Sequence, residues 1–258
     1  MKYLSFIIIA LSIASCKNEP EAKSLSADEI INKSIEVSGG EKFERSAIDF
    51  DFRGKIYTST REKGKFTLSR TSIEADSIFI IDHLNNEGYS RQIGKMKTNG
   101  LKTIVVEDSM AVKYIASVNS VHYFSTLPYG LNDKAVNKSL LNEERIKNKD
   151  YYKIKVTFNE EGGGEDYEDV FVYWIDKELF KLDYLAYSYN EDDGVGMRFR
   201  EVYNERYVNG LRFVDYNNYK AENTKIKLTE LGKAFEANQL KLLSKIELEN
   251  VKVDLIND

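Results

Sequence analysis

Residues 197–220 read MRFREVYNERYVNGLRFVDYNNYK, and this stretch decides the fold. Its centre, Asn209-Gly210, is the strongest short-range signal for a two-residue β-hairpin. The hairpin joins a strand expected over 197–208 to a strand expected over 211–220. We therefore expect the second half of the chain to be built from antiparallel neighbours.

The residues before this hairpin continue the same pattern. Short strands are expected over residues 138–145, 151–158, 170–175 and 181–190, separated by polar turns. Residues 170–175 read VFVYWI and are apolar at every position, so both faces of this strand should be covered. The acidic, glycine-containing loop 160–169 lacks the ligand spacing of an EF-hand. We interpret it as a hairpin loop and predict no metal site.

The first half also contains strands. Residues 47–57 alternate apolar and mostly polar positions, which predicts one long strand. A turn over 62–65 then leads into a strand around 66–68. A further strand, 77–84, contains a continuous apolar run and is expected to be covered on both faces.

Helices are expected at only three places. Ser26 and Glu29 have the spacing of a capping box, and Gly39-Gly40 ends the short amphipathic helix that follows. Residues 107–126 change to helical spacing, with Pro128 just beyond. A short helix over 229–237 precedes a last alternating strand through residues 246–253.

Long antiparallel runs with few, separate helices predict an α+β fold. We expect a strongly curved antiparallel sheet, a half-barrel, with helices covering its concave face. The expected organisation is a cleaved signal peptide over residues 1–15, a lipidated N-terminus and tether over 16–25, and one domain over 26–258.

The N-terminal segment has the layout of a bacterial lipoprotein signal peptide. Lys2 precedes the apolar run Leu4–Leu11, and small residues lead to Cys16, the only cysteine of the chain. The run is shorter than the roughly 20 residues of a spanning helix. A buried strand would leave Lys2 and the small residues unexplained. We expect Cys16 to carry the lipid that anchors the protein to a membrane, and we expect that membrane to be the outer membrane.

Composition and motifs exclude several function classes. The net charge of −5 argues against nucleic acid as a partner. His83 and His122 lie in different predicted elements, and no phosphate loop, dinucleotide fingerprint or nucleophile elbow is present. Asp82 and His83 are neighbours on a strand and should point to opposite faces. We therefore predict no catalytic residues, no metal and no cofactor.

Aromatic residues gather on the central strands, where an apolar body with a polar tip suits the wall of a cavity for amphiphiles. The predicted cavity-lining residues are Tyr173, Trp174, Tyr184, Tyr187, Tyr203 and Tyr216. A predicted polar site comprises Asp183, Arg198, Arg200 and Asp215. The simpler alternatives are cross-strand aromatic packing and a solvated face with ion pairs.

Several segments resemble an uncharacterised family of bacterial lipoproteins. They are FSTLPYGLND (124–133), FVYWID (171–176), DYLAYS (183–188), RFR (198–200) and GLRFVDY (210–216). The N-terminal helix, its Gly-Gly stop, the long first strand and the unit made of a strand, Ile-Asp, a turn and a strand are similar to the LolA/LolB-like superfamily. That resemblance implies an apolar ligand between a concave sheet and its helices, and it assigns no catalytic residue.

Together these features predict a membrane-anchored envelope protein that binds a lipid or other amphiphile. The alternative is a structural or protein-interaction module without a ligand. An enzyme is the third choice. Some relatives carry an aldolase name, which implies a lysine on a strand of a (β/α)8 barrel, and this chain does not alternate strands with helices as that barrel requires.

Overall fold

The computed structural model describes residues 24–95, 98–164, 167–191, 194–223 and 225–257. The helical elements are α1 (Ala27–Ser38), η1 (Gly40–Arg45), η2 (Ala75–Ser77), α2 (Asp108–Thr126), η3 (Leu228–Glu230) and α3 (Leu231–Glu236). The predicted signal peptide, Cys16 and most of the tether lie outside the described residues. Within the described part of the chain, no helix has the length and apolar character needed to cross a membrane.

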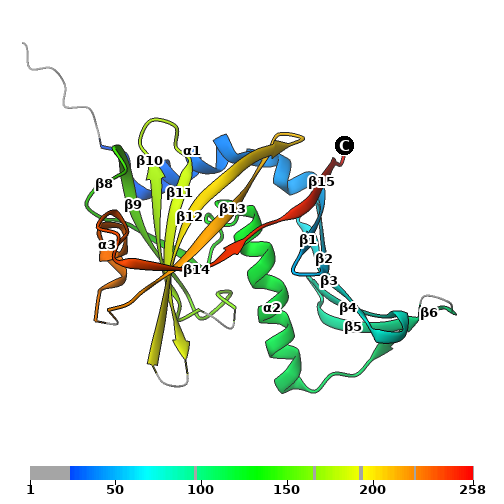
Figure 1. The fold of residues 1–258 in the computed structure, drawn as a ribbon. Helices are drawn as coiled ribbons and strands as arrows, with labels where there is room; N and C mark the ends of the chain where they lie inside the picture. Colours follow the sequence, from blue (N-terminus) through cyan, green and yellow to red (C-terminus); the bar gives the residue numbers. More distant parts are fainter. Residues whose placement is uncertain (1–23, 96–97, 165–166, 192–193, 224, 258) are drawn as a thin grey trace, which may run out of the picture.

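The strands form two antiparallel sheets (Figure 1). Sheet A has the order β15-β1-β2-β3-β4-β5-β6, and sheet B has the order β14-β13-β12-β11-β10-β9-β7, with β8 also paired to β9. The strands of sheet A are β1 (Ser46–Phe52), β2 (Lys55–Glu62), β3 (Lys65–Glu74), β4 (Ile78–Asn85), β5 (Gly88–Lys95), β6 (Thr98–Ile104) and β15 (Glu249–Leu255). Those of sheet B are β7 (Val136–Leu140), β8 (Glu144–Ile146), β9 (Lys149–Phe158), β10 (Val170–Asp176), β11 (Leu182–Glu191), β12 (Gly194–Val208), β13 (Leu211–Ala221) and β14 (Leu240–Ile246).

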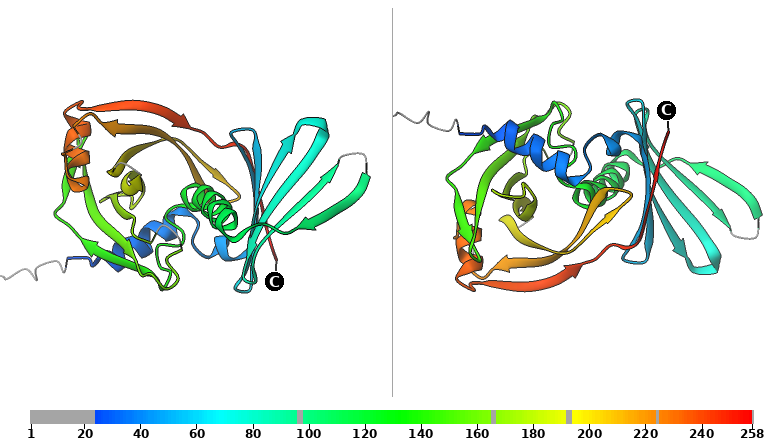
Figure 2. Two further views of the ribbon diagram at one scale, coloured as in Figure 1. Left: turned by 90° about the horizontal axis from the view of Figure 1, so that it is seen from below. Right: turned by 90° about the horizontal axis from the view of Figure 1, so that it is seen from above.

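The α+β class and the curved antiparallel architecture are confirmed. Figure 2 shows sheet B curving around α1 and α2, with α3 on the outer side of the curve. Ile30 and Ile31 of α1 pack with Tyr173 and Leu185 of the inner face. Two helices thus cover the concave face as expected, and α3 covers part of the other face.

The central strand β10 is buried on both sides, as its unbroken apolar sequence predicts. Phe171, Tyr173 and Ile175 belong to the inner cluster, whereas Val172 and Trp174 belong to the outer cluster under α3. The alternation follows from the period of two along a strand. By contrast, β4 is half-buried over most of its length, so the expectation that its apolar run is covered on both faces was wrong.

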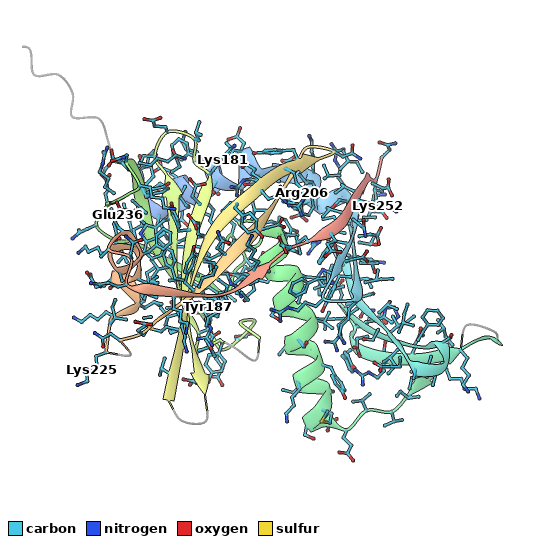
Figure 3. All side chains as sticks on the ribbon, in the orientation of Figure 1. Lys181, Tyr187, Arg206, Lys225, Glu236 and Lys252 are labelled. Carbon is cyan, nitrogen blue, oxygen red and sulfur yellow. The ribbon has the colours of Figure 1, made fainter. Side chains whose placement is uncertain are left out.

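The chain passes from sheet B to sheet A between β14 and β15, where one continuous strand was expected. Asp215, only 2% exposed, accepts a hydrogen bond from the backbone N–H of Leu248 at 2.9 Å. Arg206 (Figure 3) donates to Asp215 at 3.2 Å and to the carbonyl of Leu248 at 2.6 Å. These contacts provide hydrogen-bond partners for the N–H and C=O of Leu248, which lies between the end of β14 and the start of β15. They hold the crossover in place.

Helix α2 links the two sheets. On its sheet A side, Ser117 accepts a hydrogen bond of 2.6 Å from Arg70, which is buried and paired with Asp82. Asp82 also accepts hydrogen bonds from Tyr89 and Arg91. Three polar groups of sheet A therefore converge on one carboxylate directly beneath α2.

The capping box is present, since Glu29 N–H donates to Ser26 Oγ at 3.2 Å and Ser26 N–H donates to Glu29. The expected long strand 47–57 is instead a hairpin of β1 and β2. Arg53 and Gly54 both have positive φ, 51° and 71°, which matches the type I′ turn favoured in two-residue hairpins. The apolar alternation simply continues across the turn.

Candidate functional site

A cavity of about 440 Å³ lies between the concave face of sheet B and α2. Helix α2 forms one wall, and residues of β9 to β14 form the other. Phe52 and Arg53, from the turn between β1 and β2, complete the rim. The site is therefore assembled from both sheets, and its shape depends on the position of α2.

The wall is mainly aromatic and aliphatic. Twelve of the nineteen lining residues are of these kinds: Phe52, Val121, Tyr123, Phe124, Phe158, Phe171, Tyr187, Tyr189, Val214, Tyr216, Ile246 and Leu248. Their rings contact one another, as in the pair Phe124 and Tyr187 at 5.3 Å and the pair Phe171 and Tyr187 at 5.5 Å. An apolar wall with few polar groups is the usual character of a small-molecule site, and the volume lies in the usual range.

Arg200 is the buried cation of this cavity. Its side chain stands on β12, where the residue is 8% exposed, and it donates from Nη2 to the Tyr187 hydroxyl at 2.8 Å. The guanidinium carbon lies 3.8 Å from the centroid of the Phe124 ring. Stacking on an aromatic face stabilises a desolvated guanidinium.

Three buried phenols at or behind the cavity wall, those of Tyr123, Tyr173 and Tyr216, stay neutral near pH 7. Burial raises the pKa of Tyr216 to about 12, and nearby Arg200 offsets part of this rise. Burial also raises the pKa of Tyr123 and of Tyr173, whose hydroxyl oxygens lie 2.5 Å apart. These groups therefore act as neutral hydrogen-bonding groups in an apolar setting.

The predicted lining residues separate according to the strand face they occupy. Tyr187 and Tyr216 line the cavity, and Tyr173 is buried on the same face behind Tyr123. Trp174 and Tyr184 lie on the outer face, in the cluster beneath α3. Because Tyr173 and Trp174 are consecutive on one strand, they point to opposite faces and do not share a cavity.

Tyr203 is also outside the lining, where its hydroxyl donates to Glu247 at 2.8 Å. Of the predicted polar set, Arg200 lines the cavity. Arg198 stands over the Tyr189 ring at 5.2 Å, on the same face of sheet B.

The two predicted carboxylates are outside the cavity lining and make other contacts. Asp215 accepts the hydrogen bond from the Leu248 N–H at the crossover between β14 and β15. Asp183 accepts hydrogen bonds from Lys149 at 3.2 Å and Tyr151 at 3.1 Å. Arg198, Arg200, Asp183 and Asp215 therefore do not converge on one point. In the described residues, no cluster of His, Cys, Asp and Glu is arranged to hold a metal ion.

The α2 wall was absent from the predicted site. Tyr123 and Phe124 pack in the inner cluster of sheet B, while Tyr114, on another side of the same helix, stacks with Tyr89 of sheet A. The available signal was a second apolar stripe on the same helix. A helix with apolar residues on two sides is expected to lie between two packed layers.

A family model described as "Family of unknown function (DUF6503)" matches residues 4–248. The chain belongs to this family. The expectation that the protein belongs to an uncharacterised family is thereby confirmed. No curated protein matches the DUF6503 chain.

Solved structures with a similar chain path include a LolA superfamily protein from Nitrosomonas europaea. It has 11% identity and a TM-score of 0.41, covering 91% of this chain and 95% of that one. A putative outer membrane lipoprotein-sorting protein domain from Vibrio parahaemolyticus has 10% identity and the same TM-score, covering 80% and 96%. At identities of 10–11% and a TM-score of 0.41, neither likeness indicates a ligand or an activity for the DUF6503 protein.

Proposed function

We propose that this protein binds a lipid or another amphiphile in the cavity between α2 and sheet B. The cavity carries the proposal: it is about 440 Å³ in volume, and its walls are mostly aromatic and aliphatic. Apolar surface left open to water is unfavourable, and an apolar ligand that covers these walls removes that surface from water.

A lipid on Cys16 would hold this binding domain at a membrane of the cell envelope. The support is the sequence layout of a basic residue, an apolar run, small residues and a single cysteine. Each buried methylene of an acyl chain contributes about 0.8 kcal/mol, so more than one chain gives stable attachment. The proposed location is the outer membrane.

Native mass spectrometry tests the binding proposal. The full chain carrying Cys16→Ala is purified from cells, so that no covalent lipid is confused with a ligand. We expect a noncovalent amphiphile adduct of one molecule per chain. The Ser120→Trp variant should lose this adduct, because Ser120 lines the cavity and is only partly exposed.

Lys113→Trp is the matched control, because this residue lies on the same helix, is exposed and is outside the lining. It should keep the adduct. If the adduct survives in Ser120→Trp, binding in this cavity is contradicted. The same holds if the parent chain carries no adduct. A stoichiometric protein partner in place of the lipid would favour the alternative of an interaction module.

The anchor is tested separately. Protein with Cys16 should partition into detergent and show a mass increase on the peptide that begins at Cys16. Cys16→Ala should abolish the mass increase, which is the deciding result because an uncleaved apolar run Leu4–Leu11 would itself partition into detergent. An unmodified Cys16 in membrane-bound protein would overturn the anchor and leave the cavity proposal standing.

A further inference from the structure

Buried arginines elsewhere in the described structure are paired with carboxylates. Arg70, 7% exposed, forms an ion pair with Asp82 at 2.7 Å. Arg212, 2% exposed, forms an ion pair with Glu205. Pairing offsets the cost of removing each charge from water.

Arg200 is the exception. Within the described residues, no carboxylate lies at ion-pair distance from it, and the one hydrogen bond of its side chain goes to the Tyr187 hydroxyl. Its Nε is buried without a partner. A guanidinium has five N–H donors, so most of the donor capacity of Arg200 is unused in the protein alone.

The rings around Arg200 stabilise it only in part. The guanidinium carbon lies 3.8 Å from the Phe124 centroid, 5.0 Å from that of Tyr187 and 5.7 Å from that of Tyr216. Aromatic contacts of this kind offset only part of the cost of removing the charge from water. They also fix the plane of the guanidinium, which prepares its remaining N–H groups to meet a planar or tetrahedral oxyanion.

The charge on the cavity wall agrees with an anionic ligand. Arg53 and Arg200 are the cations of the lining, and Asp169 is its carboxylate, so the described lining is positive by one charge. Arg53 is exposed at the rim, whereas Arg200 is buried. The inner cation is therefore the one that an enclosed headgroup would meet.

We infer that the ligand of this cavity is an amphiphile with one oxyanion group, a carboxylate or a phosphate, which binds Arg200 while its apolar body lies against the aromatic walls. This inference rests on the proposed function and names its ligand class. Guanidinium groups pair with carboxylate and phosphate through two parallel charge-assisted hydrogen bonds.

The test compares three probes that share one alkyl chain: myristate, the corresponding alcohol and the corresponding trimethylammonium. Each is titrated by calorimetry, below its micelle concentration, into delipidated full chain carrying Cys16→Ala. Myristate should bind tightest. Arg200→Met should weaken myristate about 10- to 100-fold, the loss of a hydrogen-bonded charge pair, and leave the alcohol unchanged.

Arg145→Met is the matched control, since Arg145 is exposed and pairs with Asp150 at the surface. It removes the same charge and should not change myristate binding. Arg200→Lys keeps the charge without the planar fork, and it should fall between the parent and Arg200→Met. Circular dichroism of every variant checks that the fold is retained.

The outcomes separate the two proposals. If the parent binds myristate and the alcohol equally, and Arg200→Met changes neither affinity, the oxyanion inference is overturned while apolar binding stands. If the parent binds none of the three probes, both proposals fail. Preference for tetradecyl phosphate over myristate would retain the inference and identify phosphate as the oxyanion.

Discussion

The carboxylate of Asp82 holds Arg70, and Arg70 donates to Ser117 on the helix that forms one wall of the cavity. Asp82→Asn tests this connection between sheet A and α2. The substitution keeps the size of the side chain and removes its charge. Arg70 and Arg91 would then face an uncharged amide. Burial alone would raise the pKa of Asp82, but hydrogen bonds from Arg91, Tyr89 and Arg70 outweigh it and lower the pKa.

The magnitude follows from burial. The side chains of Arg70, Asp82 and Arg91 are 8%, 1% and 13% exposed. Removing one partner from a buried ion pair costs about 3–5 kcal/mol, because the other charge stays buried without compensation. For a chain of this length, the loss corresponds to a melting temperature lower by about 6–20 °C.

The assay is urea unfolding followed by far-ultraviolet circular dichroism, which reports on both sheets. Asp150→Asn is the matched control, because Asp150 and Arg145 form an exposed pair with side chains 58% and 60% exposed. The control should lose no more than about 1 kcal/mol.

A rescue variant checks the cause. Replacing Arg70, Asp82 and Arg91 together by Met, Leu and Met should restore most of the stability, since an apolar set of similar volume can replace a buried charge cluster. A loss for Asp82→Asn no larger than that for Asp150→Asn would refute the reasoning. So would a triple variant that is less stable than Asp82→Asn.

Three further predictions concern stability. Burial lowers the pKa of His122 to about 4, so the folded state binds a proton less readily than the unfolded state does. The free energy of unfolding should therefore be highest above about pH 6.5 and fall by about 3 kcal/mol as the pH falls toward 4. His122→Gln should remove that component of the loss in acid denaturation curves; unchanged curves would contradict it. Arg200→Met should raise the unfolding free energy of delipidated protein by about 1–4 kcal/mol, because an unpaired buried charge is removed; a lower melting temperature would count against it. Gly232→Ala would place a Cβ against Glu144 Oε1 and should cost about 1–3 kcal/mol in urea unfolding, whereas Gly100→Ala, with open space around it, should be neutral.

Local signals predicted much of the fold. The capping box at Ser26 and the hairpin at Asn209-Gly210 each depend on residues within a few positions, and both are present. The change to helical spacing placed α2 within a residue of its observed start. The turn at Arg53-Gly54 was missed because apolar alternation runs through it unbroken.

Other parts depend on contacts that no local pattern contains. Strands β5 and β6 were not predicted, since Gly88–Lys95 is largely polar and the pairing with β4 supplies its order. The single strand expected through residues 246–253 divides between two sheets because Asp215, more than thirty positions away, binds the Leu248 N–H at 2.9 Å.

The site was predicted in outline. Aromatic density on the central strands indicated a cavity wall, and Tyr187, Tyr216 and Arg200 do line the cavity. Composition does not indicate which face of the sheet each side chain occupies. Trp174 and Tyr184 were therefore grouped with the lining residues, although they lie on the outer face under α3. The α2 side of the wall required knowledge of which helix face meets sheet B.

The most direct measurement of the central claim is photo-crosslinking with a diazirine-bearing myristate, mapped by peptide mass spectrometry on the full chain carrying Cys16→Ala. The account predicts label on the peptides of α2, of β9 to β14 and of the turn between β1 and β2, competed away by unlabelled myristate and lost in Ser120→Trp. Label elsewhere, such as on the edge strand β6, or label unaffected by Ser120→Trp, would contradict binding in the cavity.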